Sequence, residues 1–133
     1  MRAVLDPNVV ISGLISSTGA PAEVLRAVQS GRVEVIVSPL VIEELQNALA
    51  YPKLRRLIDT DEVSRAVEWL SAVARHMPDP TDAPPRRSQD PDDDHLIALA
   101  ASSQAALVSG DRHLLALKNE IPVYSPREFI ELI

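Results

Sequence analysis

Four acidic residues stand where their side chains could share one chemical task. Asp6 ends the apolar run "AVL", Asp111 follows "AALVSG", Glu44 lies within "PLVIEELQNAL", and Asp93 begins "DDHLIALAAS". Ligands of an open parallel sheet bind beyond the carboxyl ends of its strands, so Asp6 and Asp111 meet there if their strands are neighbours. Carboxylates that lie so close raise each other's pKa unless a cation lies between them. Because oxygen-only sites suit hard divalent ions, the pattern predicts a site for Mg²⁺ or Mn²⁺.

The composition excludes several other kinds of site. The chain has 133 residues, enough for one domain with its own core, and only one Trp, two Tyr and one Phe, so we expect an aliphatic core. It has no Cys, which excludes disulfides, thiolate metal sites and cysteine nucleophiles. Nothing near Met1 resembles a signal peptide, and the apolar runs are too short to span a bilayer. We therefore expect a cytoplasmic protein that does not enter a membrane.

The net charge of −6 argues against a general attraction to nucleic acid. Much of the negative charge is local, however, because Asp90, Asp92, Asp93 and Asp94 are crowded together and a divalent cation would offset part of it. Positive side chains flank the acidic motifs, namely Lys53, Arg55, Arg56, Arg86, Arg87 and Arg112. Net charge alone does not decide the substrate.

The predicted elements alternate between strands and helices. Proline at helix starts, the apolar period of each segment and the turn residues between them give the assignments. We predict strands at 2–6, 32–38, 105–109 and 121–125, and helices at 7–16 (limited by Gly13), 21–31, 39–50, 53–58, 61–76, 93–104, 111–117 and 126–133. A proline-rich loop spans 78–91. Alternation of this kind predicts an α/β fold whose parallel sheet is covered by helices on both faces.

Four segments that hold the acidic residues follow one another along the chain: "VLDPNVVISGL" with Asp6 and Asn8, "SPLVIEELQNALAYPKL" with Glu44, "DPDDDHLIALAAS" with Asp93, and "LVSGDRHLL" with Ser109 and Asp111. In this order they resemble the PIN domain family, metal-dependent ribonucleases that include toxins of toxin–antitoxin pairs. The resemblance selects Glu44 over Glu43, and Asp93 over Asp92 and Asp94. It extends from Met1 to the final helix, and the details "YPKL" and "DPDD" resemble a subgroup described as a putative toxin component.

The resemblance implies a single PIN domain over residues 1–133, a three-layer α/β/α fold with about five parallel strands. It implies an endoribonuclease that hydrolyses single-stranded RNA with Mg²⁺ or Mn²⁺ held by Asp6, Asp93 and Asp111. Glu44 would bind the ion or orient its water, and Asn8 and Ser109 would support the carboxylates. Expected partners are the RNA, a small antitoxin protein and a second copy of the chain in a homodimer. The expected RNA contacts are Arg86, Arg87, Arg112, Lys53, Arg55 and Arg56.

One departure from the family pattern leaves an alternative open. Pro7 replaces the usual Thr or Ser after the first Asp, which removes a hydroxyl and a backbone N–H. The chain could then be a degenerate PIN domain that serves as a binding or scaffold module. A receiver-like or phosphatase reading is weaker, because "DPN" lacks a second Asp and no suitably placed Lys follows. A flap-type DNA nuclease would need more acidic residues and helices. We see no aromatic platform in the sequence that would read an RNA base.

Overall fold

The fold is described from a computed structural model that covers residues 1–133. Five parallel strands form one sheet: β1 (Arg2–Leu5), β2 (Glu34–Val37), β3 (Arg75–His76), β4 (Ala106–Val108) and β5 (Val123–Tyr124). Their order across the sheet is β3-β2-β1-β4-β5. β1 pairs with both β2 and β4, with Leu5 opposite Val108. The strands that end at Asp6 and before Asp111 are therefore neighbours, and the segments that follow β1 and β4 leave the sheet at the same end.

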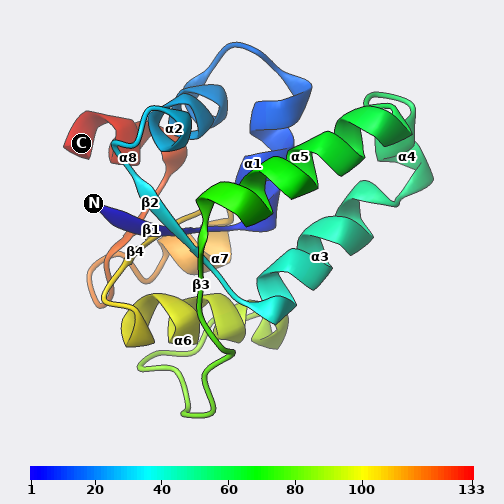
Figure 1. Ribbon diagram of the computed structural model, residues 1–133. Helices are drawn as coiled ribbons and strands as arrows, with labels where there is room; N and C mark the ends of the chain where they lie inside the picture. Colours follow the sequence, from blue (N-terminus) through cyan, green and yellow to red (C-terminus); the bar gives the residue numbers. More distant parts are fainter.

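Helices cover both faces of this sheet (Figure 1). They are α1 (Pro7–Ile15), α2 (Ala20–Gln29), α3 (Pro39–Leu49), α4 (Pro52–Arg55), α5 (Thr60–Val73), α6 (Asp94–Ser102), α7 (Arg112–Leu115) and α8 (Pro126–Leu132), with a short 3₁₀ helix, η1, at Pro91–Asp93. Figure 1 shows α2 and α8 on one side of the strands and α6 on the other. The predicted α/β fold of the PIN type is confirmed.

Local sequence explains where the helices that carry the acidic motifs begin. Asp6 and Ser38 are the N-caps of α1 and α3, and a proline stands at the first position of each helix. Ser125 starts α8 with a capping box, in which its side chain accepts from the Glu128 N–H and Glu128 accepts from the Ser125 N–H. Such caps satisfy N–H groups that have no partner inside the helix.

The core is aliphatic, as the composition predicts. Val, Leu, Ile and Ala form nearly all of the buried cluster between the sheet and its helices, and Phe129 is its one aromatic member. Trp69 packs against this cluster but stays partly exposed. No helix of the structure is both long and apolar enough to cross a membrane.

Two details of the predicted elements are wrong. The sequence predicts that residues 75–76 end a helix, but α5 ends at Val73. Arg75 and His76 form β3, which pairs with Ile36 and Val37 of β2. Backbone pairing at the sheet edge overrides the helical pattern there. Gly13 does not limit the helix, because α1 continues to Ile15. A Cβ on Gly13 would lie 2.6 Å from Leu25 Cδ1, so glycine allows α1 and α2 to pack closely.

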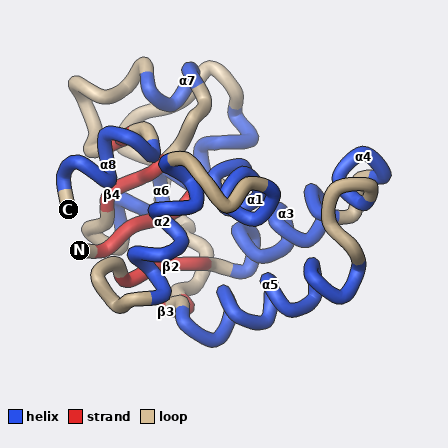
Figure 2. Tube along the Cα trace, turned by 90° about the horizontal axis from the view of Figure 1, so that it is seen from above, coloured by secondary structure: helices blue, strands red, loops and turns tan.

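The proline-rich segment lies close to the sheet, whereas the helices α3 to α5 extend away from it. Residues 77–90 contain no helix or strand, and Asp79 Oδ1 in this loop accepts a hydrogen bond from the Leu40 N–H of α3 (3.2 Å). Figure 2 shows α3 and α5 extending away from the sheet as an arm, with α4 at its far end. The loop thus borders the start of the arm, near the sheet, and α4 is far from it.

Candidate active site

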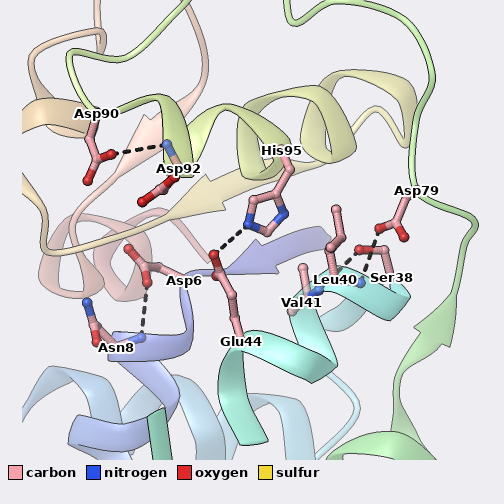
Figure 3. A network of polar contacts seen from close by, with 10 residues as sticks. All are labelled: Asp6, Asn8, Ser38, Leu40, Val41, Glu44, Asp79, Asp90, Asp92 and His95. Carbon is pink, nitrogen blue, oxygen red and sulfur yellow. Dashed lines mark hydrogen bonds and ion pairs between the residues drawn. The ribbon is translucent and has the colours of Figure 1, made fainter. Parts of the chain in front are cut away.

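Asp6 is held rigidly at the end of β1. Its side chain is almost fully buried, with 6% of the residue exposed. Oδ1 accepts from the Asn8 N–H (3.0 Å) and Oδ2 accepts from the Ser109 hydroxyl (2.8 Å). Figure 3 shows the contact with Asn8 at the first turn of α1. The backbone amide of Asn8 and the Ser109 hydroxyl therefore fix the orientation of both carboxylate oxygens.

Ser109 joins Asp6 to Asp111 across two adjacent strands. Its hydroxyl donates to Asp6 and accepts from the Asp111 N–H (3.0 Å), and the Ser109 residue is completely buried. Asp111 is the N-cap of α7, where its Oδ1 accepts from the His113 N–H (2.8 Å). The two strand-end carboxylates are therefore positioned by one shared serine.

Asp93 faces these two carboxylates from the start of α6. Burial raises its pKa from 3.8 to about 7, helped by a hydrogen bond that only the protonated acid donates to Asp111 and by the negative charges of Asp111, Asp6 and Asp90. Its Oδ2 atom is buried and has no hydrogen-bond partner. Neighbouring Asp92 is exposed, whereas Asp94 accepts from the Ser88 N–H and from Arg87. Asp93 is thus the one of the three that turns toward the other acidic motifs.

Glu44 reaches the same region through a histidine. Figure 3 shows its side chain rising from α3 toward His95 on α6, and Glu44 Oε1 lies 2.9 Å from His95 Nε2. The Glu44 side chain is 40% exposed, and Glu43 beside it is exposed at the surface. The contact places Glu44 beside His95, which follows Asp93 by two positions.

The three aspartates suit a divalent cation that keeps several of its own water ligands, such as Mg²⁺. No group of three or more acidic or histidine side chains is arranged, as the side chains lie, to hold one ion. Mg²⁺ usually keeps several waters and takes only one or two carboxylates, so a preformed cage is not required. Oxygen-only donors and the unpartnered Oδ2 of Asp93 suit such an ion, whose charge would oppose the repulsion among the carboxylates.

A cleft of about 350 Å³ opens beside Asp111. Asn8, Val9, Ser12, Pro21, Gly110 and Pro126 line the rest of it. A larger cavity of about 490 Å³ lies toward the amino ends of β4 and β5, but no acidic, basic or histidine side chain lines it. We therefore take the smaller cleft, which Asp111 lines, as the place where a substrate would meet the acids.

Comparison with known proteins decides the family. Residues 2–113 match the family model described as PIN domain. The chain belongs to the PIN domain family. Membership supports a nuclease activity, and nucleases of this family generally use divalent metals.

Relatives of this PIN domain span nearly its whole length. It is 28% identical over 142 residues to the uncharacterized protein MJ1680 of Methanocaldococcus jannaschii, an alignment that covers 98% of this chain and 90% of that protein. It is similar in fold to VapBC2 from Rickettsia felis, solved bound to a DNA fragment from their promoter, with a TM-score of 0.64, 10% identity and coverage of 94% and 98%. It is also similar to PAE2754 from Pyrobaculum aerophilum, with a TM-score of 0.65, 19% identity and coverage of 99% and 88%.

Pro7 leaves the support of Asp6 intact in this PIN domain. It stands at the first position of α1, where a backbone N–H would have no partner within the helix. The N–H that holds Asp6 belongs to Asn8, one residue further on. The departure from the family pattern therefore removes a hydroxyl but none of the hydrogen bonds that orient the first carboxylate.

The flanking cations divide into two groups. Arg86 pairs with Glu120, and Arg87 pairs with Asp94. The exposed side chains of Arg112, Lys53, Arg55 and Arg56 form no ion pair. The last three lie on or just after α4, at the tip of the arm, and are not beside the acids.

Sequence reasoning missed His95 as a partner of Glu44. No pattern in the sequence marks His95, but its side chain is only 17% exposed and its Nδ1 is buried without a partner. The two residues are 51 positions apart, and no local pattern links them. Only the way α3 approaches α6 reveals the contact.

Proposed function

We propose that residues 1–133 form a single PIN domain that acts as a metal-dependent endoribonuclease on single-stranded RNA, as the toxin of a toxin–antitoxin pair. The observation that carries the proposal is Asp93, a half-buried carboxyl near Asp111 and Asp6 whose enclosed Oδ2 atom has no hydrogen-bond partner. An uncompensated acidic group at that position costs stability and is typical of functional sites.

Asp6, Asp93 and Asp111 would hold Mg²⁺ or Mn²⁺. When bound, such an ion would lower the pKa of a water molecule and polarise a phosphoryl oxygen. Phosphodiester hydrolysis needs both effects. Asp6 has the most rigid carboxylate, because Asn8 and Ser109 each hold one of its oxygens. Ser109 also fixes the backbone of Asp111, so one hydroxyl sets the spacing of two ligands.

Glu44 would orient the attacking water and take up its proton. Its Oε1 contacts His95 Nε2, which leaves its Oε2 atom for a water. A carboxylate that is 40% exposed remains accessible to solvent and substrate. His95 thus acts as a positioning residue for Glu44, and Arg112, beside Asp111, would contact a phosphate.

Cleavage of RNA tests this proposal directly. We expect slow cleavage of single-stranded RNA with Mg²⁺ or Mn²⁺, and none with EDTA. Asp111→Asn should remove activity with little change in melting temperature, because its side chain is partly exposed and outside the core. Asp61→Asn, the same substitution at an exposed position on α5, is the matched control and should cleave like wild type. Inactivity of the wild type with both metals would refute the proposal.

The partnership with an antitoxin rests on fold similarity. VapBC2 of Rickettsia felis was solved bound to promoter DNA. Its fold is similar to that of 94% of the present chain. We propose by extension that a small antitoxin protein binds this domain. Purification from the native host should then yield a stable complex, and recovery of the domain alone would count against the partnership.

We also propose a homodimer that leaves α4 at the rim of a shared groove. Val73, at the end of α5, is 44% exposed, and Trp69 on the same helix is partly exposed. Sedimentation at tens of micromolar, well above ordinary dimer constants, should show a dimer. A monomer at that concentration would contradict this arrangement.

The degenerate-module alternative has no specific support in the geometry. Its argument was Pro7, and Pro7 leaves every hydrogen bond to Asp6 in place. A protein that binds Mn²⁺ but remains inactive on diverse RNAs, yet becomes active on Pro7→Thr substitution, would establish that alternative.

A further inference from the structure

An unpaired positive patch lies at the tip of the helical arm. Arg2, Arg75, Arg86, Arg87 and Lys118 each form an ion pair with an acidic side chain. Lys53, Arg55 and Arg56 are exposed and form none. In a chain of net charge −6, these three cations lie within four successive positions and none is in ion-pair contact, although Asp59, Asp61 and Glu62 follow at the start of α5. Cations without an ion pair are available to contact an anion.

A tyrosine stands beside these cations with its ring in solvent. Tyr51 is 66% exposed, the most of any large hydrophobic side chain. Its backbone is nevertheless fixed, because its carbonyl accepts from the N–H groups of Leu54 and Arg55 (3.0 and 3.1 Å) and its own N–H donates to Ala48 (3.3 Å). Pro52 restricts the Tyr51 backbone further, to the extended ψ of 135° observed. The ring is therefore exposed on a rigid support.

The arm connects this patch to the acidic site. Glu44 lies in α3 and Tyr51 follows the end of that helix, seven residues further on, which corresponds to about 10 Å along the helix axis. Figure 2 shows α3 leading from the sheet to α4. A single strand of nucleic acid bound along the arm would contact α4 at one end and reach the acidic site at the other.

We propose that Tyr51, Lys53, Arg55 and Arg56 form a binding subsite for single-stranded RNA, in which a base stacks on the Tyr51 ring and the cations contact the flanking phosphates. This inference rests on the proposed ribonuclease function for its biological sense, but its claim concerns binding alone. Stacking on an exposed aromatic ring together with cationic contacts to the backbone is how proteins hold unpaired nucleic acid. The platform for a base that the sequence did not reveal is thus supplied by Tyr51.

An acidic protein segment is the competing occupant, and the local shape disfavours it. An amphipathic helix that docks on another protein needs an apolar groove for its anchor residues. The hollow beside α4 has a volume of about 50 Å³ and is lined by Gln46, Leu49, Ala50, Arg55, Thr60 and Val63. It is too small to accept a row of side chains, whereas stacking needs only the free face of one ring.

Binding without cleavage tests the subsite. The probe is a fluorescent single-stranded RNA of roughly ten nucleotides, a length within ordinary single-strand site sizes, followed by anisotropy in EDTA. Tyr51→Ala should weaken binding by roughly five- to a hundredfold, the range that stacking of one base supplies. Tyr51→Phe keeps the ring and should bind within about twofold of wild type. Equal melting temperatures would show that the exposed substitutions leave the fold intact.

Salt dependence separates stacking from charge. Each lost phosphate contact reduces the magnitude of the negative slope of log K against log salt by about 0.7 for a single strand. Arg56→Gln should make the slope less steep by about that amount, and Tyr51→Ala should leave it unchanged. The matched control is Arg32→Gln, because Arg32 is exposed and unpaired but precedes β2, at the opposite edge of the sheet from the acids. It should alter neither affinity nor slope.

Three results would overturn the subsite. They are failure of the wild type to bind the RNA, equal affinity of Tyr51→Ala and Tyr51→Phe, and an effect of Tyr51→Ala on a polyglutamate peptide without an effect on RNA. The last would assign the patch to an acidic protein. Tyr51-dependent binding by a protein that cleaves no RNA would refute the ribonuclease and leave the subsite standing. Cleavage with unchanged RNA affinity in Tyr51→Ala would refute the subsite alone.

Discussion

Replacing Asp93 by Asn should stabilise the metal-free protein at alkaline pH. The carboxyl has a pKa of about 7 in the folded state, against 3.8 for an unperturbed Asp, because burial and three neighbouring carboxylates oppose its charged form. Between these two values the folded state binds more protons than the unfolded state, so stability falls as pH rises from about 4 to about 7 and is then flat. Asn cannot ionise, and the substitution should remove this loss.

The size of the effect follows from the shift and from the exposure of the group. A shift of about three units corresponds to roughly 4 kcal/mol if none of it is screened. Asp93 is only half-buried, although its Oδ2 atom is enclosed, so solvent reduces that figure to about 1–2 kcal/mol. For a domain of this length we therefore expect Asp93→Asn to raise the melting temperature by about 4–8 °C in EDTA at about pH 8.

Thermal unfolding in EDTA between about pH 4 and pH 9 measures this directly. The wild-type curve should decline through the lower part of the range, whereas the Asp93→Asn curve should decline less. Asp92→Asn is the matched control, because Asp92 is exposed one residue away, and it should follow the wild type. A wild-type stability that does not change between about pH 4 and pH 7, or a destabilising Asp93→Asn at about pH 8, would refute the reasoning.

Addition of the cation should reverse the order of the two proteins. A ligand that binds only the folded state stabilises it by about 2.7 kcal/mol at a hundred times its dissociation constant. Wild type should gain this stability from Mn²⁺ or Mg²⁺ at about pH 8, and Asp93→Asn should lose most of the gain. An equal response of both proteins would mean that Asp93 does not hold the ion.

Four further predictions concern residues that support the helices. Ser125→Ala removes half of the capping box and should lower the free energy of unfolding in urea by about 1 kcal/mol, and an unchanged midpoint would contradict this. The Ser125 backbone N–H and Lys118 also lower the pKa of Glu128 to about 2, so the contribution of Glu128 is present above about pH 4.5 and is lost as pH falls toward 2. Gly13→Ala places a Cβ against Leu25 and should lower the free energy of unfolding by about 1–3 kcal/mol. An unchanged midpoint in urea would mean that α1 and α2 can move apart without loss of stability. Pro7→Thr should cost less than about 1 kcal/mol in stability and leave the response to Mn²⁺ and the rate of RNA cleavage equal or higher, and a lower rate would show that Pro7 is required.

The positions of the acids at one sheet edge could be predicted because they depend on short-range patterns. Apolar runs that end in Asp6 and Asp111 mark strand ends, and parallel strands place their ends at the same edge. The pairing of β1 with β4 then brings the two residues together, and Ser109 follows from its place between them. Strand β3 was missed because two residues carry no periodic signal, and its pairing with β2 is a property of the whole sheet.

The contacts between distant helices could not be predicted in the same way. Glu44 meets His95 because of the way α3 approaches α6, and that geometry depends on the packing of many side chains. The exposure of Tyr51 likewise depends on where α4 lies relative to α5. An aromatic residue after a helical pattern gives no sign in the sequence of whether its ring is buried or free.

The choice of Asp93 within the acidic run illustrates how structure narrows what sequence leaves open. Asp90 caps η1 by accepting from the Asp92 N–H, and Asp94 accepts from the Ser88 N–H. Asp92 is exposed to solvent, so its carboxylate loses no hydration when the protein folds. Asp93 has no capping bond, and its Oδ2 atom is buried without a partner. Because burial of an unpaired carboxylate oxygen is unfavourable unless something compensates for it, the one residue of this run with an enclosed and unpaired oxygen is the one expected to bind an ion.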